Sequence, residues 1–264
     1  MPEGPEVKIA SDYYNSFFVD AQNMEFQILT DYYQKKYKAV FDTVTDNHPN
    51  GFVPVFTVGK HLFVPLANDL LFNFHLGMTG CWSHENIKHC HFKVCSSKGE
   101  LYFRDVRKFG KMRILTNDEF TTKHKPQFDL LNVQYNKDTH LRFLNKNISE
   151  KRSICSVIMS QDYFPGVGNY IKSEALYAAR IHPEKKWGQL SNHKRLSLIN
   201  HTKNIMQHSY QTGGAELKDF KNPFDESKFS LKVYGKTNDP KGNKVISQRT
   251  SDQRKSWFCP TIQK

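Results

Sequence analysis

The sequence predicts an α+β protein with a β-rich N-terminal part and a helical C-terminal part that ends in a basic β-hairpin. Three observations support this prediction. An amphipathic stretch opens the chain, short aromatic-rich segments with alternating polarity follow it, and helical spacing dominates after residue 150. A chain of 264 residues is long enough for one or two domains with a sizeable core.

Residues 4–18 are expected to form the first helix, because apolar residues recur there every three to four positions. They are Val7, Ala10, Tyr13 or Tyr14, and Phe17. Short segments between Met24 and Leu115 then have the spacing of an antiparallel sandwich or barrel. Strands are expected within 36–44, 51–66, 70–82, 89–97, 100–106 and 111–115, with turn-forming breaks at 49–51, 67–69 and 97–99.

Residues 117–149 are polar and basic, and we expect the hinge between two domains in this stretch. Helical spacing follows, and the predicted helices cover 151–163, 169–181 and 193–210. His182-Pro183 and Thr212-Gly213-Gly214 supply the stops for the last two. The last 33 residues return to strands at 231–236, 243–250 and 254–258, joined by tight turns.

The charge balance points to a polyanionic partner. The chain has 38 Lys and Arg against 26 Asp and Glu, a net charge of +12 and a pI of about 9.4. Nucleic acid is the commonest such partner, although charge alone does not distinguish DNA from RNA or anionic lipid. Five cysteines, an odd number, favour a reducing compartment. Without a signal peptide or a membrane span, the protein is expected to be intracellular and to bind no membrane.

The chain opens MPEGPEV, and these residues have two readings. Proline suits a first helical turn and acids suit the positive end of the helix dipole, so an ordinary helix start is favoured from position alone. The second reading is chemical. If Met1 is removed, Pro2 carries a free secondary amine beside the Glu3 and Glu6 carboxylates.

The segment GVGN (166–169) leads directly into a predicted helix. Glycines let backbone N–H groups approach an anion at the positive end of a helix, and Asn169 adds an amide donor. Such a segment also serves packing alone. In a chain of net charge +12, a DNA phosphate is the natural ligand.

The last 33 residues hold eight Lys or Arg against two acids, so the predicted hairpin suits phosphate contact as well as it suits a charged, solvated edge. Arg254 follows a Ser-Asp turn, where a guanidinium can grip phosphate with two hydrogen bonds. In KHCHFKVC (88–95), strand packing is favoured over a metal site because no CxxC or HExxH motif accompanies it. Cys81 and Cys155 are expected to be small buried residues.

Together these segments resemble the formamidopyrimidine-DNA glycosylase/endonuclease VIII family of base-excision repair enzymes. The matching motifs occur in family order along nearly the whole chain. They are PEGPEV (2–7), VGKHLF (58–63), HLGMTG (75–80), FRDVRKFG (103–110), QDYFPGVGNYIKSEAL (161–176), RIHP (180–183), TGGAELKDF (212–220), VYGK (233–236) and QRKSWFCP (253–260).

The resemblance implies an N-terminal helix with a β-sandwich in a catalytic domain (1–125), a hinge (126–148), a helix–two-turn–helix domain (149–228) and a β-hairpin finger (229–264). It also implies roles for residues at matching positions. Pro2 is the expected nucleophile, Glu3 the acid/base group and Glu6 a supporting carboxylate. The expected phosphate ligands are Lys60, Asn169 and Arg254. Lys60 is also expected to belong to the catalytic group. Gly168 and Tyr234 are expected to be further DNA contacts. Met78, Arg107 and Phe109 match residues that fill the gap left by the extruded base. Glu174 matches another family carboxylate, with no specific role.

The implied chemistry explains these residue types. An α-amine has a pKa of about 7.7–8.0, against about 10.4 for lysine, so a useful fraction is unprotonated at neutral pH. The amine attacks the sugar C1′, expels the base and leaves an iminium, after which β- and δ-elimination remove both phosphates. Glu3 is expected to shuttle the protons.

The chain departs from the family at two places. The positions of the four zinc cysteines carry Lys241, Lys244, Cys259 and Ile262, and one thiolate cannot hold tetrahedral zinc. The finger is therefore expected to fold without metal, as in the zincless endonuclease VIII-like 1 branch. The segment between Phe220 and Val233 is shorter than the loop that closes over 8-oxoguanine, which favours oxidised pyrimidines and hydantoins as substrates.

The sequence therefore predicts a bifunctional DNA glycosylase and β,δ-lyase that needs no cofactor and no metal. Its expected partner is double-stranded DNA with an oxidised base or an abasic site, with single-stranded DNA as a further option and a monomer as the working form. The alternative is a non-catalytic damage-binding protein on the same scaffold. An RNA-binding module would fit the charge but not the N-terminus.

Overall fold

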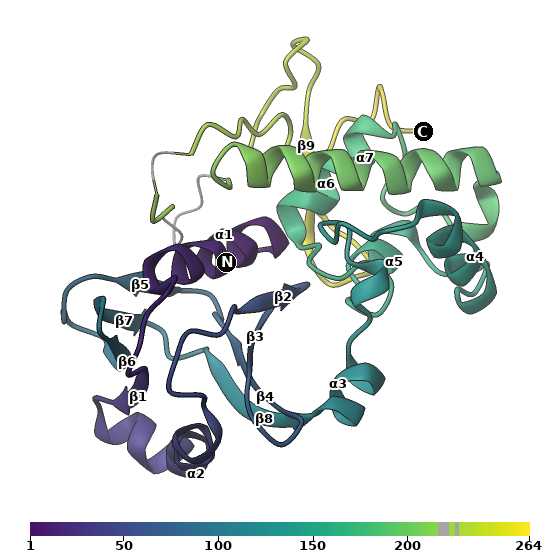
Figure 1. Ribbon diagram of the computed structural model, residues 1–264. Coiled ribbons are helices and arrows are strands. Elements are labelled where there is room, and N and C mark those ends of the chain that lie inside the picture. The colour runs from purple at the N-terminus through teal and green to yellow at the C-terminus, as the bar shows by residue number, and fades with distance from the viewer. Residues whose placement is uncertain (216–221, 225–226) are drawn as a thin grey trace. The chain divides into compact units, whose positions relative to one another are not determined.

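The computed structural model describes residues 1–215, 222–224 and 227–264, and the chain divides into two compact units (Figure 1). The N-terminal unit contains residues 1–2, 6–124 and the described part of 216–227. The C-terminal unit contains residues 3–5, 125–215 and 228–264. Within the described ranges, no helix is both long and apolar enough to cross a membrane.

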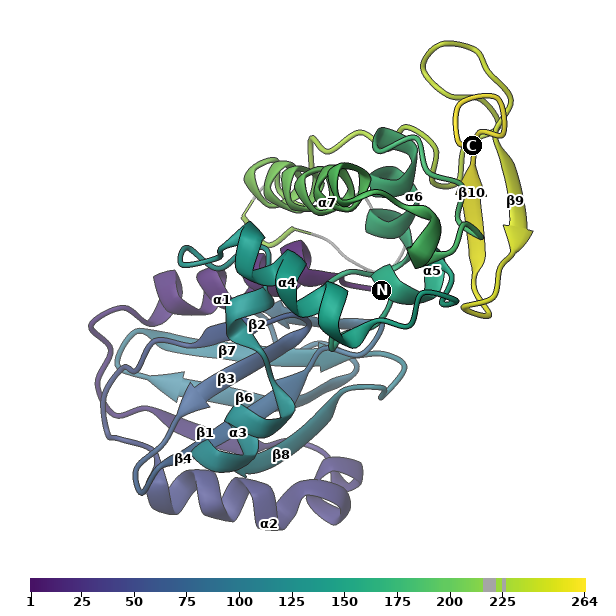
Figure 2. The same ribbon diagram turned by 90° about the vertical axis from the view of Figure 1, so that its right-hand side faces the viewer.

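The N-terminal unit is built on two four-stranded sheets in which every pairing is antiparallel (Figure 2). One sheet has the order β1-β6-β7-β5 and the other the order β2-β3-β4-β8. The strands of the first are β1 (Glu25–Ile28), β5 (Gly80–Ser83), β6 (Cys90–Ser96) and β7 (Gly99–Asp105). Those of the second are β2 (Phe56–Val58), β3 (His61–Pro65), β4 (Leu70–His75) and β8 (Lys111–Thr116).

Apolar faces of these strands and of helix α1 (Gly4–Phe18) form one aromatic core. Tyr14 and Phe18 of α1 are fully buried, while Phe17 is only partly buried, so the helical stripe is rotated slightly from the expected one. The indole N–H of Trp82 in β5 donates to the Ala10 carbonyl at 3.0 Å. The predicted helix and antiparallel sandwich are confirmed.

One predicted strand of this unit is a helix. Residues 36–44 lie in α2 (Asp31–Asn47). Aromatic and β-branched residues suggested a strand, but the side chains that are buried recur at spacings of four, four and three. They are Tyr33, Tyr37, Phe41 and Val44. Packing of this stripe against the sandwich core overrides the local strand preference.

The C-terminal unit consists of helices α4 (Lys137–Asn147), α5 (Ile154–Ile158), α6 (Asn169–Ala178) and α7 (Asn192–Gln211), followed by a hairpin. Helices α6 and α7 pack closely together. Two single 3₁₀ turns, Pro126–Phe128 and Trp187–Gln189, belong to the same unit. The predicted helix over 151–163 is shorter, because Gln161 bonds the backbone of Gly166 and Val167 and turns the chain.

The polar stretch 117–149 contains two helices that the sequence did not predict. Helix α3 (Asn117–Lys123) carries a capping box between Thr116 and Glu119. Helix α4 starts at an Asn136 cap and buries His140 and Leu144. Polar composition hid both helices, and the limits of the hinge stay a prediction.

The chain ends in the antiparallel hairpin β9 (Ile246–Arg249) and β10 (Lys255–Phe258), and β10 lies against α6. No strand forms over 231–236, contrary to the prediction, since the backbone N–H groups there bond a carboxylate instead of a neighbouring strand. The α+β organisation into a sandwich, a helical part and a terminal hairpin is confirmed. The motif at 212–220 lies partly outside the described residues.

Candidate functional site

Glu3 is bound to the N-terminus of α6. Its side chain is almost fully buried, and the carboxylate accepts the backbone N–H of Gly168 at 2.7 Å, of Tyr170 at 2.9 Å and of Ile171 at 3.3 Å. The first N–H groups of a helix have no partner inside the helix and carry partial positive charge. The carboxylate therefore caps a helix that begins 166 residues further along the chain.

Gly168 makes this approach possible. A Cβ atom built on Gly168 would lie 2.3 Å from the carboxyl carbon of Glu3, so every other residue would displace the carboxylate. Asn169, the next residue, donates one side-chain N–H to the Lys255 carbonyl at 2.9 Å. The Asn169 side chain also hydrogen-bonds the Tyr234 phenol, which partly offsets the rise of that phenol's pKa.

Tyr234 lies near Glu3 and the start of α6. Burial and then the neighbouring Glu3 carboxylate raise the pKa of its phenol. Its ring lies 4.5 Å from that of Trp257, and its backbone N–H donates to Glu174 at 2.9 Å. Glu174 also accepts the N–H groups of Lys232 and Val233, so this carboxylate shapes the loop that carries Tyr234.

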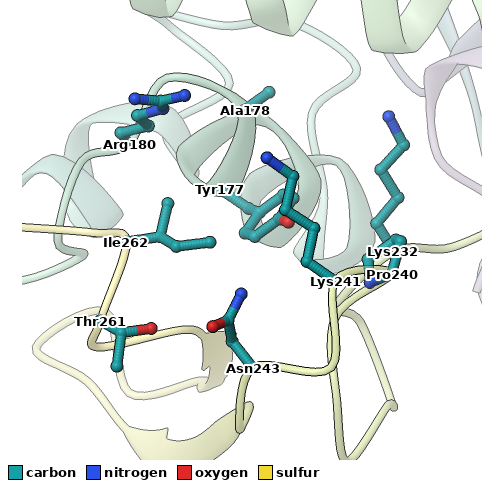
Figure 3. Close-up of a pocket in the computed structure, with 9 residues that line it drawn as sticks. All are labelled: Tyr177, Ala178, Arg180, Lys232, Pro240, Lys241, Asn243, Thr261 and Ile262. Carbon is teal, nitrogen blue, oxygen red and sulfur yellow. The ribbon is translucent and has the colours of Figure 1, made fainter.

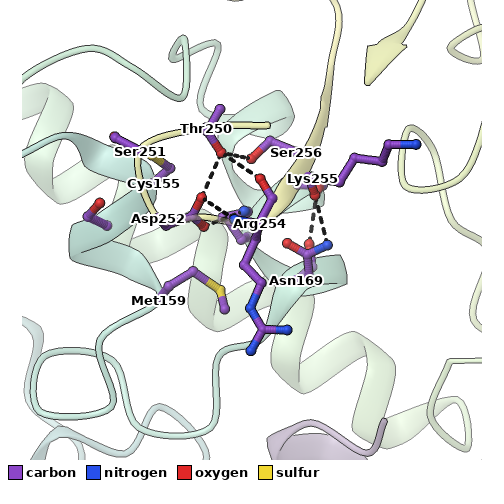
Figure 4. Close-up of polar contacts among 12 residues, drawn as sticks. Cys155, Met159, Asn169, Thr250, Ser251, Asp252, Arg254, Lys255 and Ser256 are labelled. Atoms are coloured by element: carbon purple, nitrogen blue, oxygen red, sulfur yellow. Dashed lines mark hydrogen bonds and ion pairs between the residues drawn. The ribbon is translucent and has the colours of Figure 1, made fainter. Parts of the chain in front are cut away.

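Arg254 lies at the end of a tight turn between β9 and β10, and Figure 4 shows its guanidinium pointing away from that turn. The turn itself is held by Asp252, which forms a 2.6 Å ion pair with Lys172 of α6. Both side chains of the pair are almost fully buried. Burial alone would raise the pKa of Asp252, but hydrogen bonds from Lys172 and Thr250 hold it below its usual value.

A second set of bonds holds the other side of the turn. Ser251 donates its backbone N–H and its hydroxyl to Glu184, at 2.6 and 2.8 Å. Its hydroxyl also lies 2.6 Å from that of Ser153, directly before α5. The structure thus brings Glu3, Gly168, Asn169 and Tyr234 together around the start of α6 and fixes the Arg254 turn to the same helix.

In the N-terminal unit, Pro2 and Glu6 are buried. Lys60 lies in the turn between β2 and β3, after Gly59, whose φ of +61° suits a residue without a side chain. Lys60 is largely buried near His75. Burial first, then the charges of Lys60 and Lys111, lower the pKa of His75 to about 4.

Met78, Arg107 and Phe109 lie on two adjacent loops of this unit, 76–79 and 106–110. The guanidinium of Arg107 lies 5.1 Å from the centre of the Phe109 ring, and both side chains are exposed. Asp105 joins the loops: one carboxylate oxygen accepts the Thr79 hydroxyl at 2.5 Å and the other the Gly110 N–H at 2.7 Å.

Four supporting residues, described above, were missed or left without a role by sequence reasoning. They are Asp105, Lys172, Glu174 and Asp252. Each is a charged side chain that is largely or partly buried and bonded to a residue distant in the chain. A lone charge in a sequence usually lies on a solvated surface, so no local signal marks them.

The finger residues do not fit zinc. Of the four expected ligand positions, only Cys259 carries a ligand type, and its sulfur lies 3.0 Å from the Thr261 hydroxyl. Within the part of the chain that the structure describes, no group of three or more His, Cys, Asp and Glu side chains is arranged to hold a metal ion.

Comparisons with known proteins agree with this organisation. Residues 1–112 match the formamidopyrimidine-DNA glycosylase N-terminal domain, and residues 132–221 match its H2TH domain. The formamidopyrimidine-DNA glycosylase of Novosphingobium aromaticivorans is 30% identical over 201 residues, which are 72% of this chain and 74% of that protein. The enzyme of the same name from Rickettsia felis is 29% identical and covers 100% of this chain and 98% of its own.

Solved structures share the fold over the whole chain. A complex of Lactococcus lactis Fpg with DNA containing an abasic site has a TM-score of 0.81 and 22% identity, and it covers 99% of each chain. The Thermus thermophilus MutM (Fpg) protein has a TM-score of 0.82 and 22% identity, with 99% of this chain and 98% of the other covered. The chain belongs to the formamidopyrimidine-DNA glycosylase family of DNA glycosylases and AP lyases.

Proposed function

We propose that this protein removes oxidised bases from DNA through a Schiff base on Pro2 and then cleaves the strand by β,δ-elimination. The observation that carries the proposal is the position of Glu3. This carboxylate is adjacent to Pro2 in the chain and is held by the first N–H groups of α6. Asn169 and Tyr234, two of the proposed DNA contacts, lie around the same helix start.

The proposed reaction begins after removal of Met1. The Pro2 nitrogen attacks the sugar C1′ and the bond to the base breaks, with the electron pair leaving on the base. Pro2 loses its N–H proton and the C1′–O4′ bond breaks, with the electron pair and a proton going to O4′. The product is an iminium between Pro2 and C1′, which acidifies the C2′ proton. Loss of that proton expels the 3′ phosphate, and a second elimination expels the 5′ phosphate.

Glu3 is the proposed proton carrier for these steps. In the present conformation its carboxylate accepts hydrogen bonds, and N–H donors at a helix N-terminus stabilise the ionised form. An ionised carboxylate suits removal of the C2′ proton. Glu6, buried in the first turn of α1, is proposed to support this group.

Lys60, Asn169 and Arg254 are the proposed phosphate ligands, and Gly168 is a further proposed DNA contact beside Asn169. Their different settings support this division. Arg254 projects from a turn fixed by a buried ion pair, whereas Asn169 lies at the start of α6 and is held by the Lys255 carbonyl. Met78, Arg107 and Phe109 are the proposed residues that fill the gap after the base leaves the stack.

For the substrate, we propose a preference for oxidised pyrimidines and hydantoins, as in the zincless endonuclease VIII-like 1 branch. Two sequence features support it: the absence of a zinc ligand set and the short 220–233 segment. That segment lies partly outside the described residues. A panel comparing thymine glycol and hydantoin duplexes with 8-oxoguanine tests this point, and faster excision of 8-oxoguanine would contradict it.

Borohydride trapping tests the catalytic proposal. We expect a covalent complex between lesion-containing DNA and protein that starts at Pro2, and mass spectrometry should map the sugar fragment to the first tryptic peptide. Pro2→Gly and protein that retains Met1 should lose most of the adduct. Lys244→Gln is a matched control because it alters a cation outside the proposed site.

Two outcomes would contradict the proposal. Trapping that survives both N-terminal changes would place the nucleophile on a lysine such as Lys60. Lesion binding without any trapping or strand cleavage would favour a non-catalytic damage-binding protein. Glu3→Gln should bind lesions and cut slowly, and full cutting would remove Glu3 from the mechanism.

A further inference from the structure

A cavity of about 580 Å³ lies at the end of the C-terminal hairpin (Figure 3). Its wall comes from the end of α6, from the loop before β9 and from the loop after β10. The Arg254 turn joins the other ends of β9 and β10, so one strand of four residues, roughly 13 Å, separates it from the cavity. The cavity is therefore distinct from the proposed Arg254 phosphate site.

The cavity wall carries three cations, Arg180, Lys232 and Lys241. In Figure 3, Arg180 and Lys241 come from different segments around the cavity, and the amide of Asn243 points toward the same space. All three cations are exposed, and none of their charged groups forms a hydrogen bond or an ion pair within the described part of the chain. Such a set favours an anionic ligand.

The nearest acids are engaged elsewhere. Asp239 accepts the Tyr177 hydroxyl at 2.9 Å and the backbone N–H groups of Lys241 and Asn243 at 2.9 and 2.8 Å. Glu174 is near enough to Lys232 to feel its charge, but its oxygens accept backbone N–H groups. Because these carboxylates already accept hydrogen bonds from protein donors, they do not pair with the cations that line the cavity. These cations can therefore bind an anion from solution.

The wall is held in place before any ligand binds. Asp239 fixes the 239–243 loop through the bonds just described. On the other side, the buried Gln263 accepts the Cys259 N–H at 2.8 Å and donates to the Ile181 carbonyl at 2.9 Å. These bonds tie the 259–263 loop to the residue after Arg180. A preformed wall reduces the ordering entropy that binding must overcome.

Two residues of this wall, Lys241 and Ile262, occupy positions that the resemblance assigns to zinc ligands. A zinc site would bring Zn²⁺ and thiolates to this part of the finger. Here the same part carries an ammonium group and an apolar side chain around an open cavity. The substitution changes the kind of ligand that the region suits from a cation to an anion.

We propose that this cavity binds a phosphate group. A guanidinium and two ammonium groups match the charge and the several oxygens of a phosphate better than those of a carboxylate. The volume falls within the range of small-molecule sites. The phosphate comes either from a small phosphate compound or from a DNA strand that extends past the Arg254 turn. This inference goes beyond the proposed function, since base removal does not need it.

Calorimetric titration with pyrophosphate and with deoxyadenosine monophosphate, at fixed ionic strength, tests the small-ligand source. We expect saturable binding that Lys241→Gln and Arg180→Gln each weaken by about tenfold, as the loss of one charge-assisted hydrogen bond does. Lys244→Gln is the matched control, because Lys244 is exposed in the same loop but does not line the cavity. A circular dichroism melt of each variant verifies folding.

The DNA source is tested with two abasic duplexes, one ending near the lesion and one much longer. If DNA supplies the phosphate, Lys241→Gln should weaken binding to the long duplex and leave the short one unchanged. Excision and trapping on the short duplex should be unchanged in this variant, because Lys241 lies outside the proposed catalytic site, so a failure here is distinguishable from a failure of the proposed catalysis.

Saturable pyrophosphate or nucleotide binding, or a length-dependent DNA effect, supports the proposal if Lys244→Gln does not reproduce the loss. The proposal is wrong if neither probe saturates and neither duplex distinguishes Lys241→Gln from the unmodified protein. It is also wrong if Lys244→Gln weakens binding as much as Lys241→Gln does, because that result indicates only the general positive charge.

Discussion

The Arg254 turn and the Arg107–Phe109 loop both present an exposed arginine, but they are supported differently. The first is fixed by the buried Lys172–Asp252 ion pair and by serine and threonine hydroxyls. The second depends mainly on Asp105, which bonds Thr79 and Gly110. Among its exposed side chains, Arg107 and Phe109 contact each other, and Lys108 lies over the ring of Tyr32 in α2.

The difference matches the proposed tasks. A phosphate has a fixed place on the DNA backbone, so its ligand gains from being held rigidly before binding. Side chains that enter the gap behind an extruded base must leave solvent and stack, which a loop held at its base allows. Three of the predictions below test this contrast and one compares the pH dependence of the two units, from the largest expected loss of stability to the smallest.

Lys172→Met should have the largest effect. It leaves the Asp252 carboxylate buried without its partner, and breaking a buried ion pair destabilises a protein by about 3–5 kcal/mol. Urea unfolding measures the loss, with the exposed Lys236→Met as control. Adding Asp252→Leu to the variant should recover part of the stability. A loss no larger than that of the control would contradict the anchoring role.

Asp105→Ala should cost about 2 kcal/mol, because the Gly110 N–H and the Thr79 hydroxyl lose their acceptor. Lesion DNA should also lose its advantage over undamaged DNA in a filter-binding titration. Asp105→Asn, which keeps one acceptor oxygen, should be milder. The exposed Glu85→Ala is the control, and equal losses in both variants would remove Asp105 from the role.

The N-terminal unit should lose stability first as the pH falls. His61, His75 and His124 lie in contact, and burial is the main cause that lowers their pKa values to about 3, about 4 and about 4. Histidines of the unfolded chain take up a proton at about pH 6.5. Between about pH 6.5 and 4 the unfolded state therefore binds more protons than the folded state. Stability is full above this window and falls within it.

Among the described residues of the C-terminal unit, one histidine has a pKa that is lowered as strongly. It is His140, and burial lowers its pKa to about 4. Urea unfolding at about pH 7 and at about pH 4.5 measures the difference in acid sensitivity between the units. Tryptophan fluorescence and hydrogen exchange report the unfolding midpoint of each unit. His61→Phe should flatten the pH dependence of the N-terminal unit. An unchanged slope would assign the acid sensitivity to other groups.

Phe109→Ala should leave the free energy of unfolding within about 0.5 kcal/mol, because half of the side chain is already exposed. Excision in a single turnover should nevertheless fall about tenfold, since the gap left by the base loses a stacking partner. Val133→Ala, at a fully exposed position outside the proposed site, should change neither quantity. Unaltered excision by Phe109→Ala would contradict its proposed role.

Sequence periodicity identified those helices and strands in which the local conformational preference of the residues agrees with the pattern of buried side chains. Helix α1 and the antiparallel strands are examples, and α7 falls within one or two residues of its expected limits. Helix α2 was missed because its aromatic and β-branched residues favour strands until tertiary packing selects every fourth side chain. The 231–236 strand failed because Glu174 takes the N–H groups that a partner strand would need.

The site divides in the same way. Motifs located Glu3, Gly168 and Asn169, which the structure brings together. They did not locate the residues that hold the site in place. Lys172 meets a partner 80 positions away and Asp105 one 26 positions away, and such pairings depend on the folded chain. The identity of one charged residue in the sequence does not indicate which distant residue it pairs with.

The bond between Glu3 and the start of α6 has a practical consequence for anyone who handles this protein. Any tag, linker or retained methionine ahead of Pro2 ties up the Pro2 nitrogen in a peptide bond, whereas the three hydrogen bonds of Glu3 form with Met1 still in place. An inactive tagged preparation should therefore melt like the released protein, because only the nitrogen is masked.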